Sequence, residues 1–215
     1  MNYDEYFKLC RQAYDKAAPN APIESFYQKP VNILPTNSFV QTYHDLVETL
    51  SVKVATDFDS VIDCSNDNIM MKHENIWKFH HELLGLSNIL VPYLEENKYG
   101  CHLYVDKIYI YRTLKLENRV SSYEWHYDNN PDEVVKTLIY LNDVTKKNSP
   151  FEYLQSPDGH GVLGLCTRRG TDCWYPPPNN SRVGHLIEGL TEKGFIPTQV
   201  EGKKATAVSF INNSI

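Results

Sequence analysis

The chain has 215 residues, of which 41% are hydrophobic and 22% are charged, and its formal net charge is −6 at pH 7. These ordinary values fit one globular domain and exclude wholesale disorder. The sequence has no apolar run near the ~20 residues of a membrane-spanning helix, and no cluster of lysines and arginines that would bind nucleic acid. We therefore expect a single domain that works without a membrane or a nucleic acid.

The first part of the chain predicts two helices joined by a connector. Residues 2–18 carry apolar side chains at helical spacing and predict an amphipathic helix that a proline ends. The breakers and turn formers in residues 23–37 predict an extended connector. A second helix is expected over residues 38–50, where Ser38 could cap the N-terminus and Gln41, three residues later, would complete a capping-box pattern.

Helical patterning returns at residues 69–84, where we expect Gly85 to end the helix, and again at residues 87–96. Three histidines lie in this part, and we interpret them as surface or packing residues rather than metal ligands: His73, His80 and His81. Residues 1–100 therefore predict helices that support a sheet formed by the rest of the chain.

From Cys101 onward, short segments rich in β-branched and aromatic residues predict strands. The expected strands cover residues 101–116, 122–127, 134–142, 185–190, 196–200 and 205–213. Helices followed by an antiparallel barrel of strands make an α+β fold.

A long loop is expected at residues 145–184, and loops of that length are usually functional lids or disordered. Its tryptophan and its three consecutive prolines favour an ordered lid. Arg168, Arg169 and Trp174 are the candidate substrate-binding residues in this loop, since an arginine could meet an anionic substrate. The alternative is that the arginines are solvated or paired with acidic side chains.

The five cysteines are an odd number and include no C-x-x-C pair. That usage is typical of reduced thiols, and the polar N-terminus is unlike a secretory signal, so a cytoplasmic protein is expected. Cys166 and Cys173 with His160 could be considered as a zinc site. Their spacing matches no common zinc motif, so loop and core thiols are the preferred interpretation.

The most informative motif is His126-Tyr127-Asp128, which ends one expected strand just before turn-forming residues 129–132. Side chains alternate along an extended segment, so His126 and Asp128 should project from the same face. One imidazole and one carboxylate can hold a metal ion, and a second histidine would complete the 2-His-1-carboxylate triad of non-haem Fe(II) enzymes. An H-x-D motif is common by chance, and its surroundings make this one informative.

Residues 125–154, WHYDNNPDEVVKTLIYLNDVTKKNSPFEYL, resemble the phytanoyl-CoA-dioxygenase-like branch of the Fe(II)/2-oxoglutarate oxygenases. The shared pieces are W-H-x-D-x-x-P, a lysine-bearing strand, Y-L-N-D-V and a G-P-F-like turn. The resemblance covers roughly residues 104–215. It implies a double-stranded β-helix (jelly-roll, cupin-like) core in residues 101–215, supported by the N-terminal helices and ending before its last strand.

The resemblance also implies an activity. Fe(II) bound by His126 and Asp128, with 2-oxoglutarate as cosubstrate and O2, would hydroxylate a small-molecule substrate while 2-oxoglutarate is decarboxylated to succinate. Related halogenases lack the carboxylate, so Asp128 favours a hydroxylase. The distal carboxylate of 2-oxoglutarate needs a cation and hydroxyl groups. The candidates here are Tyr109, Tyr111 and Lys136, although a strand tyrosine usually packs and a strand lysine is usually solvated.

The third metal ligand departs from the family pattern. In the family, a strand similar to residues 205–214 is followed directly by the second histidine and then by an arginine. We expect that histidine just beyond Ile215, and His185 and His160 are weaker alternatives within the sequence. Two other interpretations stay open: a catalytically inactive jelly-roll binding module that lacks the second histidine, and a cupin-type enzyme that uses another metal.

Overall fold

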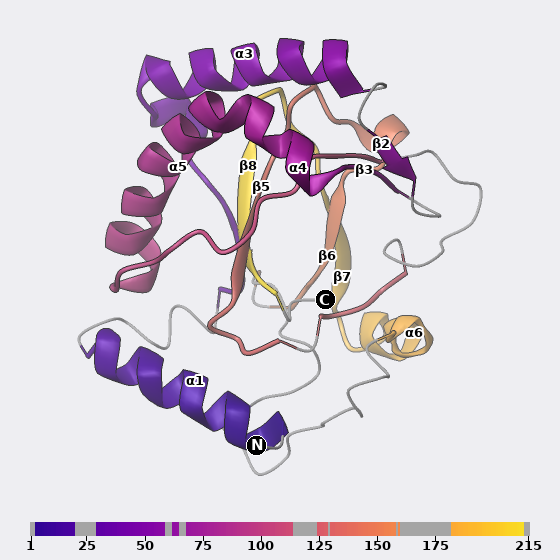
Figure 1. The fold of residues 1–215 in the computed structure, drawn as a ribbon. Helices are drawn as coiled ribbons and strands as arrows, with labels where there is room; N and C mark the ends of the chain where they lie inside the picture. The colour runs from indigo at the N-terminus through magenta and orange to yellow at the C-terminus, as the bar shows by residue number, and fades with distance from the viewer. Residues whose placement is uncertain are drawn as a thin grey trace.

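The computed structural model describes residues 3–19, 29–58, 62–64, 68–113, 124–128, 130–157, 159 and 182–212. These residues combine helices with small antiparallel sheets, so the expected mixed class is confirmed (Figure 1). The sheets of this part of the chain do not close into a barrel. Nor does any helix in it have the length and apolarity needed to cross a membrane.

Two long helices, α3 (Gln41–Asp57) and α5 (His80–Leu94), pack against each other. Their contact is close because Gly85 of α5 faces Leu46 of α3. A β-carbon at residue 85 would lie 2.8 Å from a methyl carbon of Leu46, nearer than real contacts allow. Helix α1 (Tyr3–Ala17) lies apart from this pair in Figure 1, and the Tyr14 hydroxyl joins it to the fold by donating to the Tyr99 carbonyl at 2.8 Å.

The central sheet has the order β1-β8-β5, with β1 at Val31–Ile33, β8 at Ala207–Ile211 and β5 at Val135–Ile139. Strand β8 is the middle strand and is buried on both faces. Ala207 and Ile211 belong to the core that α3 and α5 share, whereas Val208 and Phe210 pack on the opposite face. This two-sided burial explains why β8 reads as a nearly continuous apolar run.

A second sheet, β6 (Phe151–Gln155) with β7 (Ile196–Val200), covers that opposite face. The rings of Phe151 and Phe210 lie 4.7 Å apart between the two sheets. The Tyr140 hydroxyl also links the sheets: it donates to the Val200 carbonyl at 2.7 Å and accepts from the Phe151 N–H at 3.0 Å. The layers are therefore helices, central sheet and second sheet, as Figure 1 shows.

A third small sheet contains β2 (Ile62–Cys64), β3 (Asn68–Met71) and β4 (Tyr111–Thr113). Two further α-helices of the described residues are short: α4 (His73–Ile76) before α5, and α6 (Ile187–Thr191) before β7.

Four expected elements are confirmed: the first helix as α1, and the strands at 134–142, 196–200 and 205–213 as β5, β7 and β8. The second helix begins at Gln41 rather than Ser38 and continues to Asp57. Ser38 does not cap it, because its hydroxyl donates to the Pro35 carbonyl at 2.7 Å in a preceding 3-10 turn.

The helix expected at residues 69–84 is wrong at both ends. Its first residues form β3, where pairing with β2 and β4 overrides the local pattern. Gly85 does not end the helix but lies inside α5, where it faces the side chain of Leu46. The continuation at residues 87–96 was correctly placed as helix, since α5 reaches Leu94.

The strand expected at residues 101–116 is restricted to β4, residues 111–113, within the part of it that the structure describes. One of its early backbone groups is already bonded elsewhere: the Leu103 N–H donates to the Glu95 carboxylate at 2.6 Å. Residues 185–190 form a 3-10 turn and α6 instead of a strand. Leu186, Ile187 and Leu190 pack together at helical spacing, a pattern that a short apolar run does not distinguish from a strand.

The loop expected at residues 145–184 contains an unforeseen strand, β6. In the segment expected as a strand at 122–127, the described residues make one bridge, between His126 and Arg182.

Candidate metal centre

The H-x-D motif lies in an extended segment that packs on an apolar cluster and pairs with the chain around Val183. The Val183 N–H donates to the Trp125 carbonyl at 2.8 Å, beside the His126–Arg182 bridge. Trp125 and Tyr127 turn toward the apolar cluster formed with Leu154 and Val183. The side chains of His126 and Asp128 alternate with these two and take the other face of the segment.

The contacts of the His126 imidazole favour one tautomer. Its Nδ1 lies 2.6 Å from the backbone carbonyl of Glu124, and a carbonyl oxygen only accepts, so Nδ1 carries the proton and donates. In the neutral ring this leaves the lone pair on Nε2, which lies 3.5 Å from Oδ1 of Asp128. Metal-binding histidines are commonly oriented in this way, by donating the other ring N–H to a carbonyl or carboxylate.

Asp128 makes three polar contacts, one through its backbone and two through its carboxylate. Its backbone N–H donates to the carbonyl of Asn212 at 3.2 Å. Its Oδ2 accepts from the ammonium of Lys136, and its Oδ1 faces the imidazole. The side chains of His126 and Asp128 are 26% and 29% exposed, so solutes can reach the pair.

The separation of the two candidate ligand atoms fits one metal ion. Ligands about 2.1 Å from a common ion lie about 3.0 Å apart at a right angle and about 3.4 Å apart at a tetrahedral angle. The observed 3.5 Å between Nε2 and Oδ1 is close to the second value. A small closing movement of either side chain would reach the first.

Lys136 reaches Asp128 from β5, directly opposite Phe210 of β8 in the register of the central sheet. Paired residues in antiparallel strands share a face, and Phe210 packs between the two sheets. Lys136 therefore lies on the inner face of the central sheet, and the H-x-D pair sits at the end of the space between the sheets.

Two residues contribute to this site that sequence reasoning missed. Asn212 follows β8 and holds Asp128 through its backbone carbonyl. Glu124 orients the imidazole through its own carbonyl. Neither role depends on side-chain type, so no residue signal in the sequence could have indicated it.

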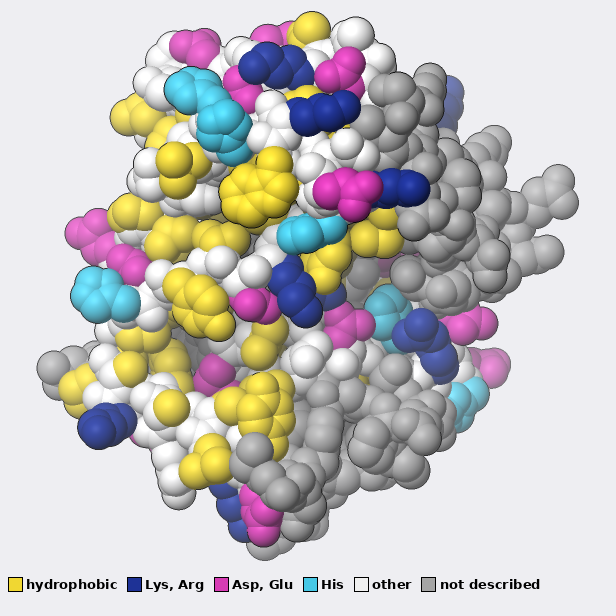
Figure 2. Space-filling view, in the orientation of Figure 1, with side chains coloured by type: hydrophobic (Ala, Val, Ile, Leu, Met, Phe, Trp, Pro, Cys, Tyr) yellow, Lys and Arg dark blue, Asp and Glu magenta, His cyan; other side chains and the backbone are white. Residues whose placement is uncertain are grey.

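Of the other expected site residues, Tyr109 and Tyr111 are 54% and 44% exposed and belong to the region of β4, in a different sheet from Lys136. They are among several large apolar side chains at the surface, and Figure 2 shows such side chains intermixed with charged ones on one face of the molecule. His185 is exposed in the turn before α6. Arg168, Arg169, Trp174, His160, Cys166 and Cys173 lie outside the described residues.

Among the residues that the structure describes, no group of three or more His, Cys, Asp or Glu side chains is arranged to hold a metal ion. His126 and Asp128 form a pair, and His185 does not join it. His73, His80 and His81 are exposed around the start of α5, as expected for surface residues.

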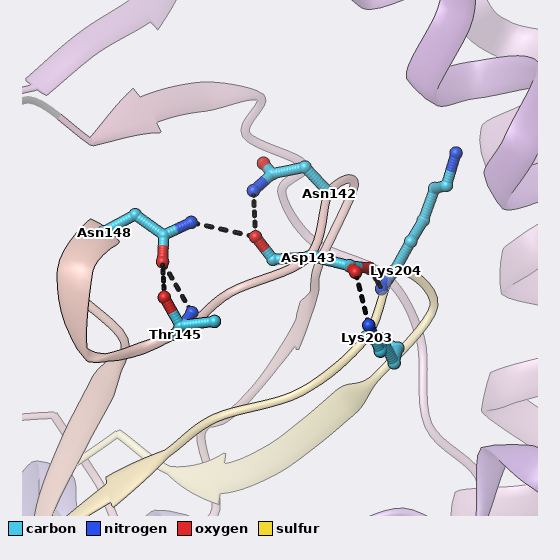
Figure 3. A network of polar contacts seen from close by, with 6 residues as sticks. All are labelled: Asn142, Asp143, Thr145, Asn148, Lys203 and Lys204. Atoms are coloured by element: carbon cyan, nitrogen blue, oxygen red, sulfur yellow. Dashed lines mark hydrogen bonds and ion pairs between the residues drawn. The ribbon is translucent and has the colours of Figure 1, made fainter.

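The opposite end of β5 and β8 carries a second polar cluster, shown in Figure 3. Asp143 accepts from the Lys203 ammonium at 2.8 Å and from the Lys204 N–H at 2.9 Å. Its backbone carbonyl accepts from the side-chain amides of Asn142 and Asn148, both at 2.8 Å. The Lys203 hydrogen bond, the Lys204 N–H and the two lysine charges hold the pKa of Asp143 below its usual value.

In comparisons with known proteins, no family model matches the chain and no curated protein matches it. The oxygenase interpretation therefore depends on the motif and on the geometry described above.

Proposed function

We propose that the chain is an Fe(II)- and 2-oxoglutarate-dependent dioxygenase that hydroxylates a small-molecule substrate and converts 2-oxoglutarate to succinate. The observation that carries this proposal is the convergence of His126 Nε2 and Asp128 Oδ1 to 3.5 Å. The ring tautomer and the lysine partner of the carboxylate both favour a metal-binding arrangement.

The layered fold supports the same proposal. Two antiparallel sheets face each other across an aromatic core, and helices cover the outer face of the larger sheet. We propose that this arrangement is the part of a double-stranded β-helix that the described residues contain. In such a core the reacting groups lie at the end of the space between the sheets, which is where Lys136 and the H-x-D pair lie.

In this proposal each residue has a separate role. Bound iron would supply the oxygen chemistry, and the protein would position it and exclude water. His126 and Asp128 would hold the ion, and the Lys136 ammonium would hold Oδ2 so that only Oδ1 binds. Monodentate binding would leave more positions for the cosubstrate and for O2.

Lys136 is also the candidate cation for the cosubstrate, because it already lies at the pair. Tyr109 and Tyr111 remain candidate hydroxyl partners for 2-oxoglutarate, and Arg168, Arg169 and Trp174 remain candidate substrate contacts. Among the described residues, no third His, Cys, Asp or Glu ligand lies beside the pair.

Iron-dependent formation of succinate from 2-oxoglutarate tests the proposal. The wild-type chain should form succinate only with Fe(II) and O2, and the variants His126→Ala and Asp128→Ala should form none. The matched control is Asp143→Ala, which removes a lysine-paired carboxylate from the other end of the same strands. It should keep the activity, provided that circular dichroism shows the same fold.

The second candidate is a jelly-roll binding module without catalysis. It is favoured by the lack of a third His, Cys, Asp or Glu ligand beside His126 and Asp128 in the described ranges. Binding of 2-oxoglutarate without iron-dependent succinate formation, measured by calorimetry on the wild-type chain, would support this candidate over the dioxygenase.

A further inference from the structure

The side chain of Asn212 is the least explained polar group near the candidate metal centre. The residue is only 6% exposed, and its Oδ1 accepts no hydrogen bond from any of the described residues. Buried amide oxygens in native proteins almost always have a donor, because an unsatisfied buried acceptor is unfavourable. The described residues therefore leave this oxygen open to a partner that they do not supply.

The backbone of Asn212 holds the residue at the metal centre from two directions. Its carbonyl accepts from the Asp128 N–H at 3.2 Å, and its N–H donates to the Val134 carbonyl at 2.9 Å. It thus joins the H-x-D segment to the start of β5. Both backbone partners of Asn212, Asp128 and Val134, belong to segments that border the candidate site.

The alternation of β8 indicates the face that the side chain takes. Phe210 packs between the two sheets and Ile211 packs toward α3 and α5. Asn212 is the turn residue directly after β8, and continuing this alternation by one residue would place its side chain on the inner face. Lys136 lies on that face, and its ammonium reaches Asp128.

We propose that the amide oxygen of Asn212 completes a cation site with His126 Nε2 and Asp128 Oδ1. The inference rests on the proposed function, since it supplies the metal pair with a third ligand from within this chain. A nitrogen, a carboxylate and an amide oxygen are a donor set for a divalent ion such as Fe(II) or Mn(II). The site would satisfy the buried oxygen and explain why an asparagine follows the apolar strand.

Titration of the 215-residue chain with Mn(II), followed by electron paramagnetic resonance, tests this inference without any turnover. Asn212→Leu keeps a similar volume but removes the oxygen, so it should weaken Mn(II) binding by about 10-fold or more. Asn212→Asp replaces the amide with a charged ligand and should tighten binding by a similar factor.

The melting temperature of the metal-free protein gives a second readout. Removing an unsatisfied buried oxygen should raise it, so metal-free Asn212→Leu should melt above wild type. The matched control is Ser209→Ala, in a fully buried position of β8 whose hydroxyl lies 3.0 Å from that of Tyr99. It should lower the melting temperature and leave Mn(II) affinity unchanged.

The outcomes separate this inference from the proposed function. If Asn212→Leu and Asn212→Asp both bind Mn(II) as wild type does, while His126→Ala does not, the Asn212 ligand is wrong and the metal pair stands. If wild type binds no Mn(II), both fail. A lower melting temperature for metal-free Asn212→Leu would also overturn the inference, because it would show that the amide is needed for folding alone.

Discussion

Strands β5 and β8 carry a lysine–aspartate pair near each of their two ends, and the two ends differ in how completely their polar groups are bonded. At the Asp143 end, both carboxylate oxygens accept hydrogen bonds, and the backbone carbonyl accepts two more. At the Asp128 end, Oδ2 accepts from Lys136, but Oδ1 lies 3.5 Å from an imidazole nitrogen. The buried oxygen of Asn212 has no donor among the described residues.

We interpret the Asp143 end as a structural contact and the Asp128 end as the proposed binding site. At the Asp143 end the polar groups satisfy one another, so they fasten the chain after β5 to the turn before β8. At the Asp128 end, Oδ1 of Asp128 lies 3.5 Å from His126 Nε2, and the buried oxygen of Asn212 has no donor among the described residues. Spare acceptors that a fold holds in place are the feature expected of a cation site.

The largest expected effect comes from removing a ligand. Asp128→Ala should weaken Mn(II) binding by about 100-fold or more, since even a change in an outer-shell partner weakens metal binding by about 10–100-fold. Asp143→Ala should leave the affinity unchanged, because that carboxylate is already occupied by Lys203 and Lys204. Calorimetric titration of both variants measures the contrast, and equal losses would break the comparison.

The next effect is on stability and concerns the Asp143 end, where the polar groups are fully bonded. Tyr140→Phe removes a buried hydroxyl that serves the Val200 carbonyl and the Phe151 N–H, so unfolding should become easier by about 2–3 kcal/mol. Urea denaturation measures the change. Tyr104→Phe, at an 84% exposed position, is the control and should change stability by less than about 0.5 kcal/mol. A small effect of Tyr140→Phe would mean that water replaces the hydroxyl.

A smaller effect is expected for the two lysines. Lys136→Met should weaken Mn(II) binding by about 10-fold, because Asp128 loses the partner that fixes Oδ2. Lys203→Met, the matched change at the other end, should not affect it. Tighter binding by Lys136→Met would show that repulsion between the ammonium and the metal outweighs the positioning of the carboxylate.

The smallest effect concerns pH. The pKa of Asp143 is lowered in the folded protein, mainly by the Lys203 hydrogen bond, so its stabilising contribution is present above the ordinary aspartate pKa of about 4. It disappears as the pH falls through the folded-state pKa. The melting temperatures of wild type and Asp143→Asn should therefore differ at pH 7 and converge in acid. A difference that stays constant with pH would contradict this account.

The parts of the site that follow local rules could be predicted from the sequence. His126 and Asp128 meet because side chains alternate along an extended segment, and that rule needs only two positions separated by one residue. Asn212 could not be found in this way. Its role depends on a backbone hydrogen bond to a residue far away in sequence, and on an unsatisfied oxygen that only the packing reveals.

The elements of the fold also differ in whether local sequence or tertiary contacts determine them. Strands β5, β7 and β8 are apolar or β-branched segments whose partners agree with their local preference. The segment before β4 has the same local preference, but Glu95 binds the Leu103 N–H, and β4 itself begins only at Tyr111. Leu186, Ile187 and Leu190 fit a helix as well as a strand, and the apolar cluster beneath them selects the helix.

The position of β8 in the central sheet has a consequence for biosynthesis. Its partner β1 contains Val31, and β8 contains Phe210, so the sheet joins segments from early and late translation. While the ribosome is still adding residues before 207, β1 and β5 lack the strand between them, and their apolar faces stay uncovered. Such a high contact order favours slow folding, and a nascent chain of this protein should depend on chaperones until β8 has left the exit tunnel.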